Sequence, residues 1–215
     1  MLTTPCKFSY SFKEFQILIL LLFFVVACQP ASLTEKELTT FVNDESNGLC
    51  KKNNIGEMEV KVTYRPTDLL VARELTTEQA ADTAKIRVLK KKYGKYLYFI
   101  LSLSKNNKEA LHQADGFSQY SELVQTLSFR MGEYVNLTTA ASDTIPVGDF
   151  ILDRTYGLSS ATNMLFAFNK EKSSGKEWVQ FNLNELGLGT GNVRFRFLMK
   201  NVTNAPHVIF STKEK

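Results

Sequence analysis

The chain has 215 residues, of which 44% are hydrophobic and 22% charged, and its formal net charge is +4. This length suits one compact domain with a sizeable core. The charge is small and spread along the chain, and its one dense cluster, Lys90 to Lys92 with Lys95, is typical of a solvated helix end. The balance therefore argues against a nucleic-acid partner.

An apolar run lies close to the N-terminus and extends from Ile17 to Ala27, after Lys7 and Lys13. A helix that spans a bilayer needs about 20 apolar residues, so this run is too short. A basic region, a short apolar core and a small residue at the exit are typical of a secretory signal peptide. We therefore expect residues 1–27 to be a signal peptide that the cell removes.

The run ends on Val25-Val26-Ala27-Cys28, which resembles the lipobox of bacterial lipoproteins, although that family more often has leucine where Val25 stands. The resemblance implies that the Cys28 thiol receives a diacylglycerol, that the chain is cut before it, and that acyl chains such as palmitate hold it on a membrane. One acyl chain binds a bilayer only marginally, whereas two or three retain a protein there. The alternatives are an ordinary signal peptide with an incidental cysteine, or an uncleaved anchor.

The residue after the cysteine bears on location. Gln29 is not the aspartate that marks inner-membrane retention in enteric lipoproteins, so we expect a lipid-anchored protein of the cell envelope at the outer membrane. Whether it faces the periplasm or the cell surface stays open. We expect residues 28–32 to be a lipidated tether and residues 33–215 to form a single β-rich domain.

The cysteines and histidines are few. Cys6 leaves with the signal peptide, and Cys50 is then alone unless an unlipidated Cys28 bridges to it. The spacing predicts neither a disulfide framework nor a zinc site. A catalytic thiol needs a nearby base. With only His112 and His207 available, we expect Cys50 to be a small half-buried side chain and both histidines to lie at the surface.

The first half of the mature chain mixes helix and strand signals. Ser32 to Glu35 matches a capping box at a helix start, and the turn-rich stretch 43–48 ends that helix. Met58 to Tyr64 alternates apolar with polar residues, which predicts a half-buried strand. The sequence then predicts an extended segment over 68–74, a helix over 76–94, a strand over 95–104 and a short helix over 119–127.

The second half is typical of consecutive strands. In Val193 to Met199, apolar residues alternate with Arg194 and Arg196, so Phe195 and Phe197 are expected to be buried. Strands spaced 8–12 residues apart favour an antiparallel β-sandwich or partial barrel, in a mainly β (α+β) fold with one or two helices in the N-terminal half. The expected strands occupy residues 128–139, 145–156, 163–170, 177–184, 192–202 and 207–212.

A glycine-rich stretch, Gly187 to Gly191, invites comparison with a phosphate-binding loop. Such a loop needs a helix after it, so that the helix N-terminus meets the phosphate. A strand-like segment follows here instead. The context therefore predicts a glycine-rich hairpin, and we expect no nucleotide cofactor.

The stretch "GDFILDRTYG", residues 148–157, carries two carboxylates that would share one face of a strand. Asp149 and Asp153 would then lie roughly 13 Å apart, which is too far for a paired acid/base site. They could form a weak ligand or calcium site if loop oxygens converge on them. The alternative is that Asp153 pairs with Arg154 or another cation. A Gly-x-Ser-x-Gly elbow is missing, since "GLSSA", residues 157–161, lacks the second glycine.

The mature segments "NDESNGLCK", "VTYRPTDLLVA" and "DRTYGLSSATNMLFAF" resemble a group of small lipoproteins of Bacteroidota type whose activity is uncharacterised. The resemblance implies a lipid anchor and one β-rich domain, and it implies no catalytic residue. We therefore expect a binding or assembly module with an envelope protein partner and no cofactor. The alternative is a lipid-anchored hydrolase that acts on envelope or extracellular polymers.

Overall fold

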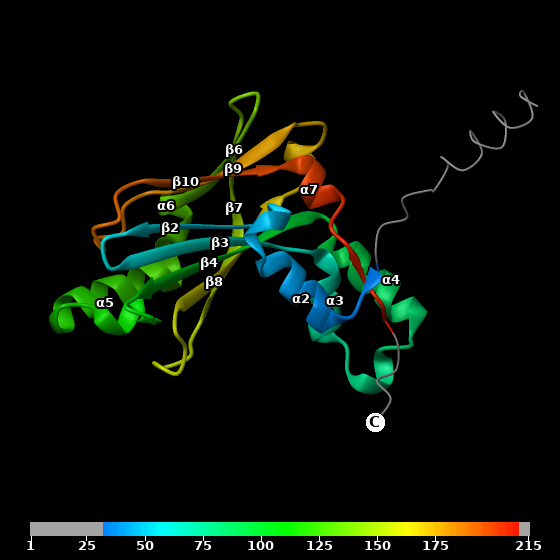
Figure 1. Ribbon diagram of the computed structural model, residues 1–215, viewed down its shortest axis with the longest axis horizontal. Coiled ribbons are helices and arrows are strands. Elements are labelled where there is room, and N and C mark those ends of the chain that lie inside the picture. The colour runs from blue at the N-terminus through cyan, green and yellow to red at the C-terminus, as the bar shows by residue number, and fades with distance from the viewer. Residues whose placement is uncertain (1–31, 211–215) are drawn as a thin grey trace, which may run out of the picture. The chain divides into compact units, whose positions relative to one another are not determined.

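The computed structural model describes residues 32–210, shown in Figure 1. The predicted signal peptide, Cys28 and most of the tether lie outside the described residues. The helices are α2 (Glu35–Asn43), α3 (Thr67–Glu74), α4 (Thr83–Tyr93), α5 (Gly116–Gln125), α6 (Met131–Tyr134) and α7 (Met199–Thr203), with a π-helical turn η4 (Thr126–Arg130) and 3₁₀ turns η1 (Glu45–Asn47), η2 (Thr77–Gln79), η3 (Ala110–Gln113) and η5 (Glu171–Ser173). The strands are β1 (Ser32–Leu33), β2 (Cys50–Ile55), β3 (Met58–Arg65), β4 (Tyr96–Lys105), β5 (Lys108–Glu109), β6 (Val135–Thr139), β7 (Thr144–Asp153), β8 (Thr162–Asn169), β9 (Trp178–Leu183), β10 (Val193–Leu198) and β11 (His207–Val208).

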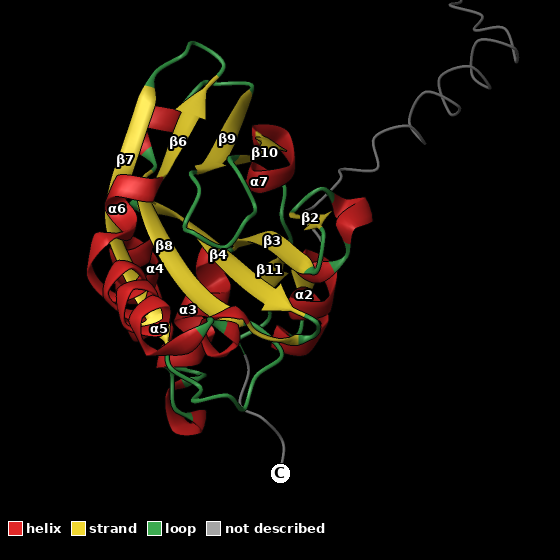
Figure 2. Cartoon of the chain, turned by 90° about the vertical axis from the view of Figure 1, so that its left-hand side faces the viewer, coloured by secondary structure: helices red, strands yellow, loops and turns green. Residues whose placement is uncertain are grey.

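Nine strands form one antiparallel sheet in the order β10-β9-β6-β7-β8-β4-β3-β2, with β5 on β4. Strand β7 belongs to both halves, because its first part pairs with β6 and its second part with β8. The register shifts between Val147 and Asp149, and such a bulge bends a sheet. Figure 2 shows β6, β9 and β10 lying across from β8, β4 and β3. The predicted mainly β, partly barrel-like fold is confirmed.

Phenylalanines fill the space between the two halves of the sheet. The ring of Phe99 on β4 lies 5.9 Å from that of Phe181 on β9 and 5.0 Å from that of Phe197 on β10. The predicted alternation of β10 is confirmed, because Phe195 and Phe197 are buried while the intervening arginines are exposed. Every residue of this core lies between positions 33 and 210, so we expect residues 29–215 to fold without the preceding segment.

The first helix begins two residues later than the sequence pattern predicted. Thr34, not Ser32, caps α2, and its side chain exchanges hydrogen bonds with Glu37 in a capping box. Ser32 and Leu33 instead pair in parallel with His207 and Val208 of β11. Both Ser32 and Thr34 are good caps by residue type, and the strand pairing decides between them.

The segment "DLLVARE" was predicted to be extended, and that prediction is wrong, because it forms helix α3. Pro66 stands at the N-cap, and Asp68 follows in the first turn, which is a helix-start pattern. The buried positions Asp68 and Val71 are three residues apart, as a helix requires. Within residues 32–210, no helix has the length and apolar character needed to cross a bilayer.

A buried carboxylate joins α3 to α4 and β11 at what we call the helical end, the end of the described part that carries α2, α3 and α4. Asp68 on α3 accepts hydrogen bonds from the Lys90 ammonium of α4 and from the Val208 amide, and lies 3.1 Å from Nδ1 of His207. Strand β11 also packs on α2 and α3. Figure 1 places α2, α3 and α4 at one end of the described part and α5 at the other. His207 is exposed, as expected, but belongs to this structural network.

Candidate functional site

The loop between β7 and β8, residues 154–161, meets turn η3 and helix α5 at the end away from α2 to α4. The first four residues of this loop, 154–157, are the end of the stretch "GDFILDRTYG". Strand β5 ends at Glu109, and η3 then carries His112 toward the loop. Residues that are far apart along the chain therefore meet here.

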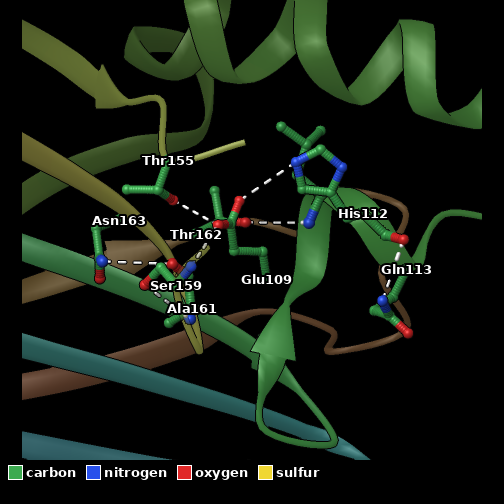
Figure 3. A network of polar contacts seen from close by, with 9 residues as sticks. Glu109, His112, Gln113, Thr155, Ser159, Ala161, Thr162 and Asn163 are labelled. Atoms are coloured by element: carbon green, nitrogen blue, oxygen red, sulfur yellow. Dashed lines mark hydrogen bonds and ion pairs between the residues drawn. The ribbon is translucent and has the colours of Figure 1, made fainter. Parts of the chain in front are cut away.

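Glu109 is the centre of this meeting (Figure 3). Its side chain is 3% exposed. It accepts hydrogen bonds from the Thr155 hydroxyl and from the Ser159 amide at 2.9 Å, and its Oε2 lies 3.4 Å from Nε2 of His112. One buried carboxylate thus binds both sides of the loop to turn η3.

The charge of Glu109 is maintained by these partners. Burial raises the pKa of this carboxyl, but the Thr155 hydroxyl, the Ser159 amide and His112 oppose it, and the net pKa lies below the ordinary 4.5. Glu109 is therefore ionised at neutral pH. A buried ionised carboxylate is stable only when hydrogen bonds replace its lost hydration, so the loop backbone is part of its solvation.

Further polar contacts fix the base of the loop. The Thr162 hydroxyl accepts from the Leu111 amide at 3.0 Å, and the Ser104 hydroxyl donates to the Ser160 carbonyl at 2.6 Å. Between the paired residues Ser102 of β4 and Asn163 of β8, the Ser102 hydroxyl donates to Oδ1 of Asn163 at 2.6 Å. These bonds join the loop to β4 and η3, so its base is held at several points.

The tip of the loop is apolar and exposed. Tyr156 is 78% and Leu158 92% exposed, and Phe117 of α5 is 85% exposed. Tyr156 has φ of 53°, a left-handed conformation that is unfavourable for an aromatic residue. Gly157 follows with φ of 82°. Backbone strain of this kind persists only where the surrounding structure imposes it, and Glu109 bonds the residue before Tyr156 and Ser159 after it.

Helix α5 extends the apolar surface beside the loop. Phe117, Tyr120 and Val124 are spaced by three and four residues and therefore share one helical face. Tyr120 and Val124 line a small cavity together with Tyr156, while Phe117 continues the same face into solvent. We call the exposed residues Phe117, Tyr156 and Leu158 the apolar tip.

Glu109, His112 and the cavity beneath the loop do not have the geometry of a catalytic site. The cavity beneath the loop measures about 80 Å³, whereas ligand sites typically enclose about 300–1,000 Å³. A catalytic acid–histidine pair activates a hydroxyl or thiol on the second ring nitrogen. Among residues 32–210, no hydroxyl or thiol is hydrogen-bonded to His112. The pair instead contributes to holding the loop.

The two predicted ligand residues, Asp149 and Asp153, are exposed on β7, where they lie opposite Ala167 and Asn163 of β8. An Asp149 oxygen accepts from the next amide, that of Phe150, at 2.8 Å. In the described part of the chain, no group of three or more histidine, cysteine, aspartate or glutamate side chains is arranged to hold a metal ion. Neither aspartate meets His207, which lies at the helical end.

Two other residues from the sequence analysis have defined positions. Cys50 is buried, more fully than expected, and its sulfur accepts from the Thr63 hydroxyl at 3.4 Å. Arg154 donates to the Ser128 hydroxyl at 3.2 Å. Among residues 32–210, the salt bridge considered between Asp153 and Arg154 is not formed.

The backbone amides of the glycine-rich stretch after β9 bind the carboxylate of Glu185, which lies just before it. The Glu185 carboxylate accepts from the amides of Leu188 at 2.7 Å, Gly189 at 3.0 Å and Gly191. Burial raises the pKa of Glu185, but these amides lower it further than burial raises it. Amides that could bind a phosphate are thus occupied by a side chain of the same loop.

Sequence reasoning missed both carboxylates. Glu109 lies 46 positions before Thr155 and 50 before Ser159, so no local pattern connects them. Glu185 stands two residues before a cluster of glycines, and that spacing was a usable signal.

Comparison with known proteins adds no relative. No family model, curated protein or solved structure matches this chain.

Proposed function

We propose that the chain is a lipid-anchored binding or assembly module of the cell envelope, without catalytic activity, and that it contacts an envelope protein through the apolar tip. The observation that carries this proposal is the exposure of Tyr156 and Leu158 on a loop whose base is held by the buried Glu109. Apolar side chains that gather on a surface mark interaction sites more often than chance.

Rigidity of the loop supports the proposal. Binding costs free energy when a flexible loop must be ordered, and preorganisation lowers that cost. The Glu109, Thr162 and Ser104 contacts hold the loop before any partner arrives. Exposed aromatic side chains on a rigid base are also typical of the residues that dominate interface energies.

The filled interior favours binding at the surface over a reaction inside the sheet. Fully buried side chains occupy the space between its halves, and the largest are Phe99, Phe166, Phe168, Phe181 and Phe197. A hydrolase of envelope polymers would need a cleft with convergent polar groups. The Glu109 cavity is too small for a sugar or peptide unit.

The arrangement of the two ends also fits an anchored module. The described chain begins at Ser32 beside β11, α2 and α3, whereas the apolar tip lies at the α5 end. With acyl chains on Cys28, the helical end would face the membrane. The tip would then point away from it, toward proteins of the envelope space.

Site-specific photocrosslinking in cells tests this function. A photoreactive residue is placed at Leu158 and, as a matched control, at Ala141, which is exposed in the turn between β6 and β7. We expect one defined protein adduct from Leu158 and none from Ala141. Tyr156→Asn should weaken that adduct, because it removes the ring while asparagine tolerates the left-handed backbone.

Two results would contradict the proposal. Equal crosslinking from both positions would mean that the tip has no partner, and an adduct unaffected by Tyr156→Asn would mean that the tip does not carry the contact. The anchor is tested separately by Cys28→Ser and detergent partition. If the mature variant stays membrane-bound, acylation of Cys28 is not what holds the chain there.

A further inference from the structure

A lysine-lined hollow lies beside the helical end of the molecule. Its cavity of about 890 Å³ is lined by Lys95, Lys170, Lys176 and Lys200. These lysines come from separate elements: the start of β4, the two flanks of η5, and α7. The Lys170 amide donates to the Lys95 carbonyl at 3.0 Å, so the β4 and η5 sides are joined. We call these four residues the lysine hollow.

The charge of the lysine hollow is largely uncompensated. Lys176 pairs with Asp143 at 2.8 Å. The other three lysines form no ion pair with any residue between 32 and 210, and Glu171 is the one acidic residue among those lining the cavity. Cations that gather in a concave surface raise the local positive potential and attract anions.

A second, shallower depression of about 470 Å³ continues this surface along α4. It shares Lys95 and Tyr96 with the hollow and adds Val88, Lys91 and Lys92. Val88 is 65% and Tyr96 38% exposed. Basic residues interleaved with an apolar residue and a tyrosine are the composition of surfaces that lie at a membrane–water interface.

The connectivity places α4, the helix that carries part of this surface, close to the expected anchor. Ser32 pairs with His207, and His207 shares the Asp68 carboxylate with Lys90 of α4. Ser32 is only four positions after Cys28 in the sequence. A fully extended chain spans at most about 3.6 Å per residue, so a lipid on Cys28 would hold Ser32 within roughly 15 Å of the bilayer.

We propose that the lysine hollow and the adjoining α4 surface dock on an anionic bilayer and bind the phosphates of its lipid headgroups. This proposal uses the proposed anchor for its orientation, and it adds a second membrane contact that fixes the tilt of the domain. A lysine near an anionic surface contributes about 1 kcal/mol. One lysine is weak alone, but the several lysines of this surface add up, and acyl anchoring would raise the effective concentration of the contact further.

Vesicle flotation of residues 29–215 tests the docking without the lipid anchor, since this part contains the whole core of the described residues. Vesicles of phosphatidylcholine are compared with vesicles that also contain phosphatidylglycerol. We expect binding only to the anionic vesicles, and weaker binding as salt rises, because salt screens exposed charges. Equal binding to both compositions, or no binding to either, would overturn the proposal.

Matched variants locate the contact. Lys95→Gln with Lys200→Gln should lower the partition coefficient about 30-fold, which corresponds to about 1 kcal/mol for each lysine. Lys108→Gln with Arg194→Gln removes the same charge from exposed positions on β5 and β10, and should leave binding near that of the unmodified protein. An equal loss in both double variants would mean that net charge, not this surface, drives binding.

Inorganic phosphate separates a lipid surface from a soluble ligand. At constant ionic strength, phosphate in place of chloride should leave vesicle binding unchanged. Displacement by phosphate would assign the hollow to a soluble phosphate compound and overturn membrane docking. Because residues 29–215 lack Cys28, these results are independent of acylation, so failure here and failure of the proposed anchor can be told apart.

Discussion

Replacing Glu109 by glutamine should destabilise the protein measurably although the two side chains have the same shape. The carboxylate accepts from the Thr155 hydroxyl and the Ser159 amide. A hydrogen bond to a charged group contributes about 1.5–3 kcal/mol, against about 0.5–1.5 kcal/mol for a neutral one. Loss of the charge on two bonds therefore costs about 2 kcal/mol. Thermal unfolding should show a midpoint lower by about 4–8 °C for a domain of this length.

The stabilisation that the Glu109 charge provides should depend on pH in a defined direction. The pKa of Glu109 in the folded state lies below its ordinary value of 4.5. Its stabilisation is therefore complete above pH 4.5 and is lost as pH falls through the lowered pKa. The difference between the unmodified protein and Glu109→Gln should be constant at neutral pH and shrink in acid. A neutral-pH difference that is absent, or that persists unchanged in acid, would refute the reasoning.

A control variant makes the measurement specific. Glu57 lies in the exposed turn between β2 and β3, where its carboxylate is 3.9 Å from the ammonium of Lys105. Exposed ion pairs contribute little, so Glu57→Gln should change the free energy of unfolding by less than about 0.5 kcal/mol. If both variants lose the same stability, the buried contacts of Glu109 are not the cause.

Three further predictions use other parts of the fold. Phe197→Ala should cost about 3–5 kcal/mol, since it leaves a cavity in the core, whereas Arg196→Ala should barely move the unfolding midpoint; equal effects in calorimetry would contradict the assignment of faces. Glu185→Ala should speed hydrogen exchange of the Leu188 amide, which would lose its acceptor, and unchanged exchange would argue against that contact. Millimolar calcium, zinc or ATP should leave the unfolding midpoint of residues 29–215 unchanged; a rise with calcium that disappears in Asp149→Ala would make that aspartate part of a calcium site.

Most strands could be predicted because their signal is local, although residues 128–134, predicted as part of a strand, form η4 and α6. Burial in β10 follows directly from the alternation of Phe195 and Phe197 with two arginines. The fold class followed from several such segments in succession. The bend of the sheet was harder to predict, because β7 changes partner from β6 to β8 after Pro146 and bulges between Val147 and Asp149.

The helix α3 could not be separated from a strand by periodicity alone. It has eight residues, and its short apolar run suits either structure. Asp68 decides its packing through Lys90, which comes 22 residues later, and through His207, which comes 139 residues later. In the sequence Asp68 resembles an ordinary solvated carboxylate, whereas in the structure it is buried and joins α3, α4 and β11.

A buried carboxylate also joins distant segments at the opposite end, beside the stretch that carries Asp149 and Asp153. Asp149 and Asp153 drew attention because carboxylates close in sequence can share a ligand, yet both are exposed. The carboxylate that matters is Glu109, which comes from another strand and binds the backbone of the loop itself. A buried charge of this kind is costly unless every partner is present, so its contacts hold one conformation of the loop. The strained backbone of Tyr156 lies between two residues that Glu109 holds, so the apolar tip can be presented to a partner without first being ordered.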